Sequence, residues 1–187
     1  EKDPATNESL KSKRLSLSSF GERAWSARWW ASLVLHDFMN PNTNWHQTID
    51  PIMDEEWEKT KNTTGSDITE LTEAANQRAA VIGEILSQDV EFNTDFMALL
   101  GITPGSHPNT YRVLHIASLI GLYAALYYKA YRDRPRPSQL CPALLPPIPM
   151  PGHASWPGGH ATQAQLKARC MEHVLQGILP AGNLEAV

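Results

Sequence analysis

Hydrophobic side chains recur at spacings of three and four residues over much of the chain, which is the period of amphipathic α-helices. The clearest series begins at Ser66 or Asp67 and comprises Ile68, Leu71, Ala75, Ala79, Ile82 and Leu86. The alternation of apolar and polar residues that marks a half-buried strand is not found between turn residues. The pattern therefore predicts an all-α protein.

Other segments also have helical character. The first is expected to begin at Ser18 or Ser19, to carry Trp25 and Trp29 on one face, and to end near Asn40. Residues 40–66, with two prolines and several Asn and Thr, predict mostly loop with one short helix at most. The remaining helices are expected over residues 93–100, from Pro108 to about Tyr131, and over residues 159–178.

The longest apolar run extends from Val113 to Tyr128. Its 16 residues fall short of the roughly 20 that span a bilayer, so no transmembrane segment is expected. A helix that is apolar on every face is typical of the centre of a bundle. We therefore expect the helix over 108–131 to be the most buried element of a soluble helical bundle.

Length and composition indicate one globular domain. The chain has 187 residues, of which 42% are hydrophobic and 19% are charged. Residues 1–17 are polar and mixed in charge, and we expect them to form a loose arm. Residues 18–187 are expected to form a single-domain helical bundle.

Charge and cysteine content exclude some classes of function. Sixteen Lys and Arg against 20 Asp and Glu give a net charge of −4, which argues against a nucleic-acid partner. Two cysteines cannot form a disulfide framework or a four-cysteine zinc site, although one disulfide bond stays open. Residues 1–19 lack the apolar core of a signal peptide, but the chain starts without Met. The compartment is therefore left open, periplasmic or secreted if a leader was removed and cytoplasmic otherwise, and so is assembly into a homo-oligomer.

A cluster of cations stands out between Lys129 and Pro137. The first eight residues of this segment hold four cations and one Asp, a local charge of +3 in an acidic chain. The helix dipole favours cations at a helix C-terminus, which accounts for Lys129 and Arg132 but not for Arg134 and Arg136 after the helix must break at proline. The alternative is an anion site built from side-chain donors.

A second candidate half of that site follows 21 residues after Arg136, at Pro157-Gly158-Gly159-His160. A Gly-Gly step that leads into a helix presents backbone N–H groups and the positive end of the helix dipole to an anion. His160 would lie in the first turn of that helix, beside the anion. Together with the cation cluster, the sequence predicts one phosphate pocket.

These residues resemble the first two signature motifs of the type 2 phosphatidic acid phosphatase superfamily. Lys129, six intervening residues and Arg136-Pro137 match the first motif in full. The second motif resembles Pro-Ser-Gly-His and is met at three of four positions, with Gly158 where the family has serine. The superfamily contains soluble bacterial acid phosphatases and vanadium-dependent haloperoxidases, and the resemblance implies their helical-bundle fold.

The resemblance also implies a role for each residue. Lys129 and Arg136 would bind the non-bridging oxygens of phosphate or vanadate, and Gly159 would donate its backbone N–H. His160 would protonate the leaving oxygen in a phosphatase, or act as acid and base toward peroxide in a haloperoxidase. Gly158 lacks the hydroxyl donor of the family's serine. A phosphatase would need no cofactor and a haloperoxidase would need vanadate; neither implies a metal-cation site.

His153 lies in a near echo of the second motif, Pro151-Gly152-His153-Ala154, in which Met150 stands where the motif's proline would have to be. We interpret it as a residue of the pocket wall.

The family's third motif, SR-x5-H-x3-D, supplies the histidine that attacks phosphorus or ligates vanadium, and nothing after His160 fits it. Arg169 and His173 come nearest, but their spacing is four rather than six. Thirteen helical residues also turn His173 by roughly 220° from His160, away from the pocket. The nucleophile is therefore expected beyond Val187, in a longer form of the protein.

Four hypotheses remain open at this point. The first is hydrolysis of a small phosphate ester through a phosphohistidine, ranked first because hydrolysis is the commoner activity of the superfamily. The second is a vanadium haloperoxidase that acts on halide and peroxide. The third is a non-catalytic oxyanion-binding protein, which the missing motif and Gly158 favour. The fourth is a helical interaction domain whose match to the motifs is accidental.

Overall fold

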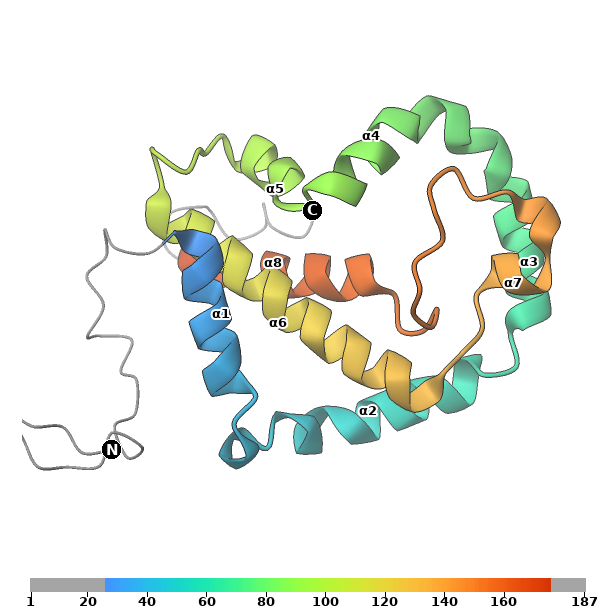
Figure 1. Cartoon of the computed structure of the whole chain (residues 1–187), viewed down its shortest axis with the longest axis horizontal. Coiled ribbons are helices and arrows are strands. Elements are labelled where there is room, and N and C mark those ends of the chain that lie inside the picture. Colours follow the sequence, from blue (N-terminus) through green and yellow to red (C-terminus); the bar gives the residue numbers. More distant parts are fainter. Residues whose placement is uncertain (1–25, 176–187) are drawn as a thin grey trace, which may run out of the picture.

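The computed structural model describes residues 26–175, and the expected arm, the expected helix start at Ser18 or Ser19 and residues 176–178 lie outside this range. Every regular element within it is helical, which confirms the all-α prediction (Figure 1). The α-helices are α1 (Ala27–Phe38), α2 (Trp45–Thr60), α3 (Thr64–Ala74), α4 (Arg78–Val90), α5 (Asn93–Leu100), α6 (Pro108–Arg132), α7 (Pro137–Leu140) and α8 (Gly159–Leu175). Short 3₁₀ turns lie at Pro41–Thr43, Ala75–Gln77 and Pro142–Leu144.

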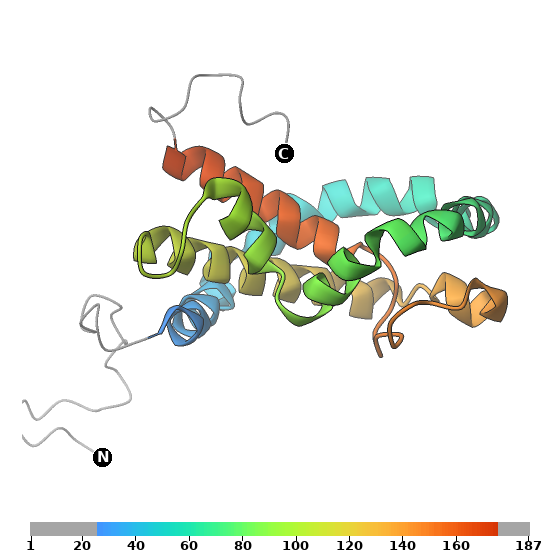
Figure 2. The same cartoon turned by 90° about the horizontal axis from the view of Figure 1, so that it is seen from above.

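The long helix α6 carries most of the buried residues of the described chain, as its apolar sequence predicts. It packs chiefly against α1 and α8, which lie on different sides of it (Figures 1 and 2). Ala117, Gly121 and Ala125 form a stripe of small residues at four-residue spacing and are all buried. A Cβ added at Gly121 would lie 3.0 Å from the Cα of Gln163, so glycine is what allows α6 and α8 to approach this closely.

The opposite face of α6 is less covered than a helix apolar on every side would suggest. Leu122, Leu126 and Tyr127 keep 37–41% of their surface exposed. The helix is also the one element of the described residues that is long and apolar enough to cross a membrane, and a third of its most apolar window is buried. Core helices of soluble proteins share this property, so the expected lack of a membrane span stays a prediction.

The prediction of a loop over residues 40–66 is wrong, because α2 occupies 16 of these residues. Pro51 lies inside α2, where it removes one backbone hydrogen bond, and this residue weighed against a helix. Tertiary packing compensates: Trp45 stacks on Phe38 with ring centroids 5.2 Å apart and contacts Tyr127 at 5.3 Å. Ion pairs one helical turn apart, such as Lys59 with Glu55 at 2.8 Å, add local support.

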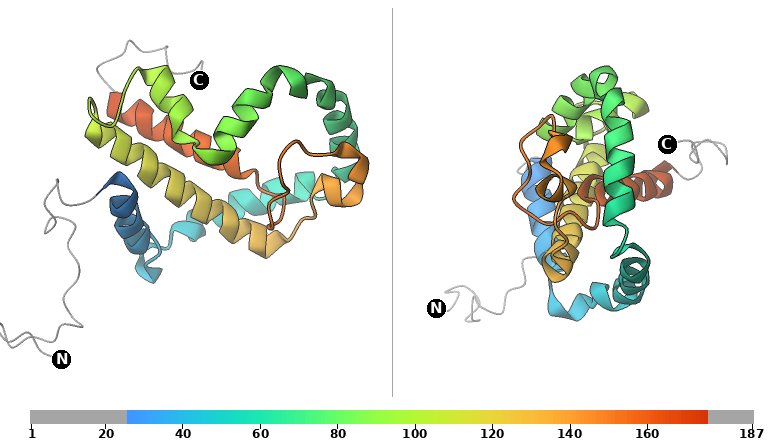
Figure 3. Two further views of the ribbon diagram at one scale, coloured as in Figure 1. Left: turned by 45° about the horizontal axis from the view of Figure 1, so that its top comes forward. Right: turned by 90° about the vertical axis from the view of Figure 1, so that its right-hand side faces the viewer.

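The helical pattern over residues 66–86 is confirmed as helix, but a 3₁₀ turn at Ala75–Gln77 divides it into α3 and α4. These two helices curve around the end of the molecule at which α7 packs against α3 (Figure 3). Neither helix contains a buried residue, and Leu71, Ile82 and Leu86 remain 39–51% exposed. The apolar face that predicted these helices is thus left open by the described part of the chain.

Candidate active site

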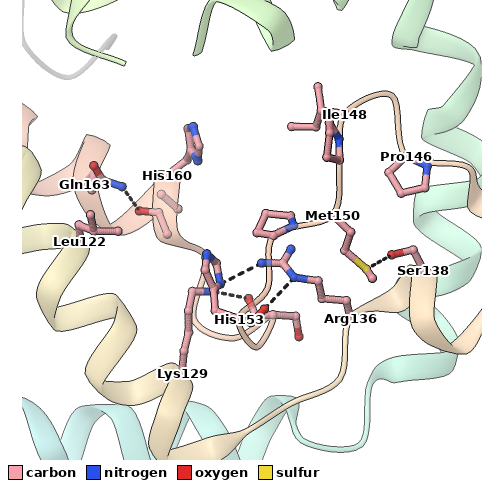
Figure 4. Close-up of a pocket in the computed structure, with 16 residues that line it drawn as sticks. Leu122, Lys129, Arg136, Ser138, Pro146, Ile148, Met150, His153, His160 and Gln163 are labelled. Atoms are coloured by element: carbon pink, nitrogen blue, oxygen red, sulfur yellow. Dashed lines mark hydrogen bonds between the residues drawn. The ribbon is translucent and has the colours of Figure 1, made fainter. Parts of the chain in front are cut away.

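A cavity of about 460 Å³ lies where the end of α6, the start of α8 and the proline-rich segment between them meet (Figure 4). Every candidate site residue from the sequence lines it: Lys129, Arg136, His153, Gly158, Gly159 and His160. Leu122, Ile148 and Met150 form part of its apolar wall. Candidate site residues up to 31 positions apart in sequence, from Lys129 to His160, are therefore brought to one cavity.

Lys129 reaches the cavity from the last turns of α6 and is 3% exposed. Its Nζ donates to the carbonyl oxygens of Ala154 at 2.8 Å and Ser155 at 2.9 Å, which leaves one of the three N–H bonds of an ammonium unused. Burial, and to a smaller extent the charge of Arg136, lowers the pKa of Lys129 to about 8. An anion in the cavity would raise the pKa of Lys129 again, because its negative charge opposes the effects of burial and of Arg136.

Arg136 follows the end of α6, which Asp133 terminates in the left-handed conformation. The next two prolines keep the chain extended, and Arg136 has φ −76° and ψ 145°. Its Nε donates to the carbonyl oxygen of His153 at 2.8 Å, and one terminal nitrogen lies 3.0 Å from His153 Nδ1. Burial lowers the pKa of Arg136, and its other terminal nitrogen has no partner among the described residues.

The other two cations of the cluster do not line the cavity. Arg132 pairs with Asp54 of α2 and lies over the ring of Trp57. Arg134 pairs with Asp67 of α3 at 2.7 Å. Of the four cations in the cluster, only Lys129 and Arg136 therefore remain candidates for binding an anion. Arg132 and Arg134 instead join the end of α6 to α2 and α3.

Within residues 26–175, no carboxylate forms an ion pair with Lys129 or Arg136. Carbonyl oxygens and one imidazole nitrogen are their only hydrogen-bond partners there. Lys129 is buried and Arg136 is partly buried, and withdrawing cations from water without a counter-charge costs free energy unless an anion joins them.

The Gly158–Gly159 step leads into α8 as expected, and the carbonyl oxygen of Gly158 accepts from the backbone N–H of Thr162 at 3.0 Å. Neither glycine has a positive φ, so the turn does not depend on glycine's conformational freedom. A Cβ at Gly158 would meet only Ala161 Cβ, at 3.5 Å. The backbone therefore has room for the serine that the family motif carries here.

His160 lies in the first turn of α8, is exposed and lines the cavity; in Figure 4 its imidazole points away from Lys129 and Arg136. The imidazole ring packs on Phe92, with centroids 4.6 Å apart. Neither ring nitrogen has a hydrogen-bond partner in the described structure, so both are available to a ligand.

His153 borders the cavity and is exposed. His153 Nδ1 lies 3.0 Å from a terminal nitrogen of Arg136, which can only donate a hydrogen bond, and 3.1 Å from the carbonyl oxygen of Ala154, which can only accept one. The two contacts require opposite tautomers of the imidazole, with the proton on Nε2 for the first and on Nδ1 for the second.

The nearest residues to a third motif stay apart from the cavity. Arg169 pairs with Glu172 at 2.8 Å, and His173 is exposed near the end of α8. In the part of the chain that the structure describes, no three His, Cys, Asp or Glu side chains could hold a metal ion together.

No family model matches this chain. No curated protein and no solved structure matches it either. The resemblance to the phosphatase superfamily therefore stays a prediction that rests on the two motifs and on the cavity that they form.

Two residues in or beside the site, Phe92 and Ser155, could not be predicted from the sequence. Phe92 was not singled out, because nothing in the sequence shows that the residue before α5 meets the first turn of α8. Ser155 was missed as well, although it ties the two motif segments together: its N–H donates to the carbonyl oxygen of Arg134 at 2.9 Å and its hydroxyl to that of Pro135 at 2.9 Å. Such long-range contacts leave no periodic signal in a single sequence.

The pKa of Lys129 predicts how oxyanion binding responds to pH. A lysine is charged below its pKa. The affinity for sulfate should therefore be highest well below pH 8, where Lys129 is protonated, and should fall as the pH rises through 8. We expect sulfate to bind about 10-fold more weakly at pH 9.5 than at pH 7. Titration calorimetry measures this, and sulfate does not itself titrate in this range. Lys129→Met should bind weakly at both pH values; an unchanged decline in this variant would exclude Lys129 as its source.

Proposed function

We propose that this chain binds a phosphate ester in the cavity and supplies the oxyanion clamp and the general acid for its hydrolysis. The observation that carries the proposal is the pair of cations, Lys129 and Arg136, that share one cavity without a carboxylate partner in the described chain. The imidazole of His160, whose nitrogens have no hydrogen-bond partner in the described chain, lines the same cavity.

Each group has a defined part in the reaction. Lys129 and the free terminal nitrogen of Arg136 would donate to the non-bridging oxygens and neutralise the charge of the phosphoryl group. The first-turn amides of α8 would add backbone donors. Each charge-assisted contact of this kind is worth about 1.5–3 kcal/mol.

His160 would act on the leaving group. As the bond between phosphorus and the ester oxygen breaks, the protonated imidazole would transfer its proton to that oxygen, so that a neutral alcohol departs. The attacking group in the described chain would be water, which yields inorganic phosphate. The apolar wall at Ile148 and Met150 is the surface on which the alcohol half would lie.

The dependence of the rate on the leaving group tests this role. An alkyl phosphate has a poor leaving group and needs the proton, whereas p-nitrophenolate departs with little assistance. We expect His160→Ala to slow hydrolysis of an alkyl phosphate about 100-fold or more, and that of p-nitrophenyl phosphate by much less. Phosphate release over long incubations at high protein concentration measures both rates.

His173→Ala is the matched control, since His173 lies on the same helix and does not line the cavity. Equal losses for both substrates in His160→Ala would contradict a general-acid role. Oxidation of bromide by peroxide in the presence of vanadate, without any ester hydrolysis, would favour the haloperoxidase instead.

A further inference from the structure

A lysine is among the most completely buried side chains of the described structure. Lys167, on α8, has an exposure of 0%. Its Nζ lies 3.8 Å from the centroid of the Phe92 ring and 3.4 Å from the carbonyl oxygen of Phe92. Within residues 26–175, no carboxylate forms an ion pair with it.

An ammonium group in this position is not explained by packing alone. Burial lowers the pKa of Lys167 to about 8, while Glu91 and Asp95 act in the opposite direction. A methionine would fill a similar volume without removing a charge from water. The contact that the charge does provide is a cation–π interaction, which is strongest away from solvent and fixes the ring that it faces.

Phe92 joins Lys167 to the proposed active site. Its ring contacts the imidazole of His160, with centroids 4.6 Å apart and an angle of 59° between the planes. His160 and Lys167 are seven residues apart on α8 and therefore share one face of that helix. Phe92 approaches this face from the end of the segment before α5 and touches both side chains.

We propose that Phe92, held in place by the ammonium group of Lys167, positions the imidazole of His160 toward the cavity. The ring of Phe92 is the only side chain that the described structure places in contact with this imidazole through an aromatic contact or a hydrogen bond. Without it, the imidazole would sample several rotamers, and fewer of them would present a nitrogen to a leaving oxygen. Phe92 and Lys167 are positioning residues, and the inference rests on the proposed function of His160.

The test compares Phe92→Leu with Phe96→Leu. Phe96 is the control, because its ring also lies near Lys167, at 5.1 Å, and against Phe92, with centroids 6.0 Å apart, but makes no ring contact with His160 in the described structure. In NMR spectra of protein labelled at histidine, His160 is assigned with His160→Ala. We expect the His160 ring protons to lose the ring-current shift of Phe92 in Phe92→Leu and to keep it in Phe96→Leu. Phe92→Tyr keeps the aromatic ring and should keep the parent spectrum.

Activity gives the second readout. In Phe92→Leu, kcat for an alkyl phosphate should fall about tenfold while the Kd for vanadate stays unchanged, because the clamp is intact and only the acid is misplaced. Lys167→Met should lower kcat in the same way, with a folded structure by circular dichroism.

Each outcome decides the inference. Unchanged His160 resonances in Phe92→Leu would overturn it, and so would shifted resonances with an unchanged kcat. If Phe92→Leu fails to fold, Lys167→Met and Phe92→Tyr are used for the test. A His160 spectrum and a kcat like those of the parent protein in Lys167→Met would contradict the proposed role of Lys167. If the parent protein hydrolyses no ester at all, the proposed function fails, whereas the NMR comparison still decides whether Phe92 orients His160.

Discussion

Replacing Arg136 with alanine should weaken vanadate binding by about 10- to 150-fold. Arg136 has a terminal nitrogen with no partner among residues 26–175, and no carboxylate of these residues pairs with it. The loss corresponds to one charge-assisted contact, about 1.5–3 kcal/mol. Vanadate titration followed by calorimetry or ⁵¹V NMR measures it.

Arg134→Ala is the control for the loss of a positive charge. Arg134 lies two residues away but pairs with Asp67 and does not line the cavity. Its removal should lower thermal stability and leave vanadate affinity nearly unchanged. Equal losses of affinity in both variants would show that the net charge of the segment, rather than a contact from Arg136, attracts the anion.

Gly158→Ser tests the same site in the opposite direction. The backbone at Gly158 is open and has no positive φ, so serine fits without strain. An added hydroxyl donor should tighten vanadate binding about 2- to 10-fold. Weaker binding in this variant would place the anion elsewhere than beside the turn.

The sequence predicted those parts of the fold whose signal is local. The helices over 93–100 and from Pro108 follow from apolar spacing bounded by Gly101 and by proline, and the structure places both as expected. The sequence did not predict α2, because its stability depends on Trp45, which packs against rings more than 70 residues away. For the same reason the sequence did not show that the apolar face of α4 is exposed in the described structure. Its apolar pattern is that of a helix packed against a core.

For the site, motif residues could be named from sequence but their neighbours could not. Lys129, Arg136 and His160 were each identified from a residue type in a particular spacing, and all three line one cavity. Which cations are free for a ligand depended on carboxylates of α2 and α3 that pair with Arg132 and Arg134. Asp54 comes from a segment in which the sequence predicted mostly loop and Asp67 from the start of a predicted helix, and no local pattern showed that either would meet these arginines.

Exogenous imidazole should accelerate hydrolysis of p-nitrophenyl phosphate by this 187-residue chain, which alone should turn over this substrate very slowly. The described cavity is lined by the residues of the proposed clamp and by the proposed acid, and Nδ1 of the other histidine that lines it, His153, is engaged by Arg136 and by the carbonyl oxygen of Ala154. Loss of one member of a catalytic unit typically costs roughly four to six orders of magnitude. The 460 Å³ cavity has room for an imidazole beside a phosphate ester.

The rescue has a defined chemistry. A nitrogen of the added imidazole attacks phosphorus, p-nitrophenolate departs, and the resulting phosphoimidazole is hydrolysed by water to phosphate and imidazole. The rate should therefore rise with imidazole concentration and saturate, and Arg136→Ala should lower the rate at every imidazole concentration because the ester is bound more weakly. Imidazole without protein gives the background rate.

Two results would contradict this account. Rapid turnover without imidazole that His153→Ala abolishes would identify His153 as the nucleophile, and its bond to Arg136 would then have to break when substrate binds. The second result is a rate of phosphate release that imidazole does not change at any concentration. It would show that the cavity binds oxyanions without aligning an ester for in-line attack. Because imidazole needs an aligned ester whereas vanadate needs only the clamp, comparing the two ligands separates an incomplete enzyme from an oxyanion-binding protein.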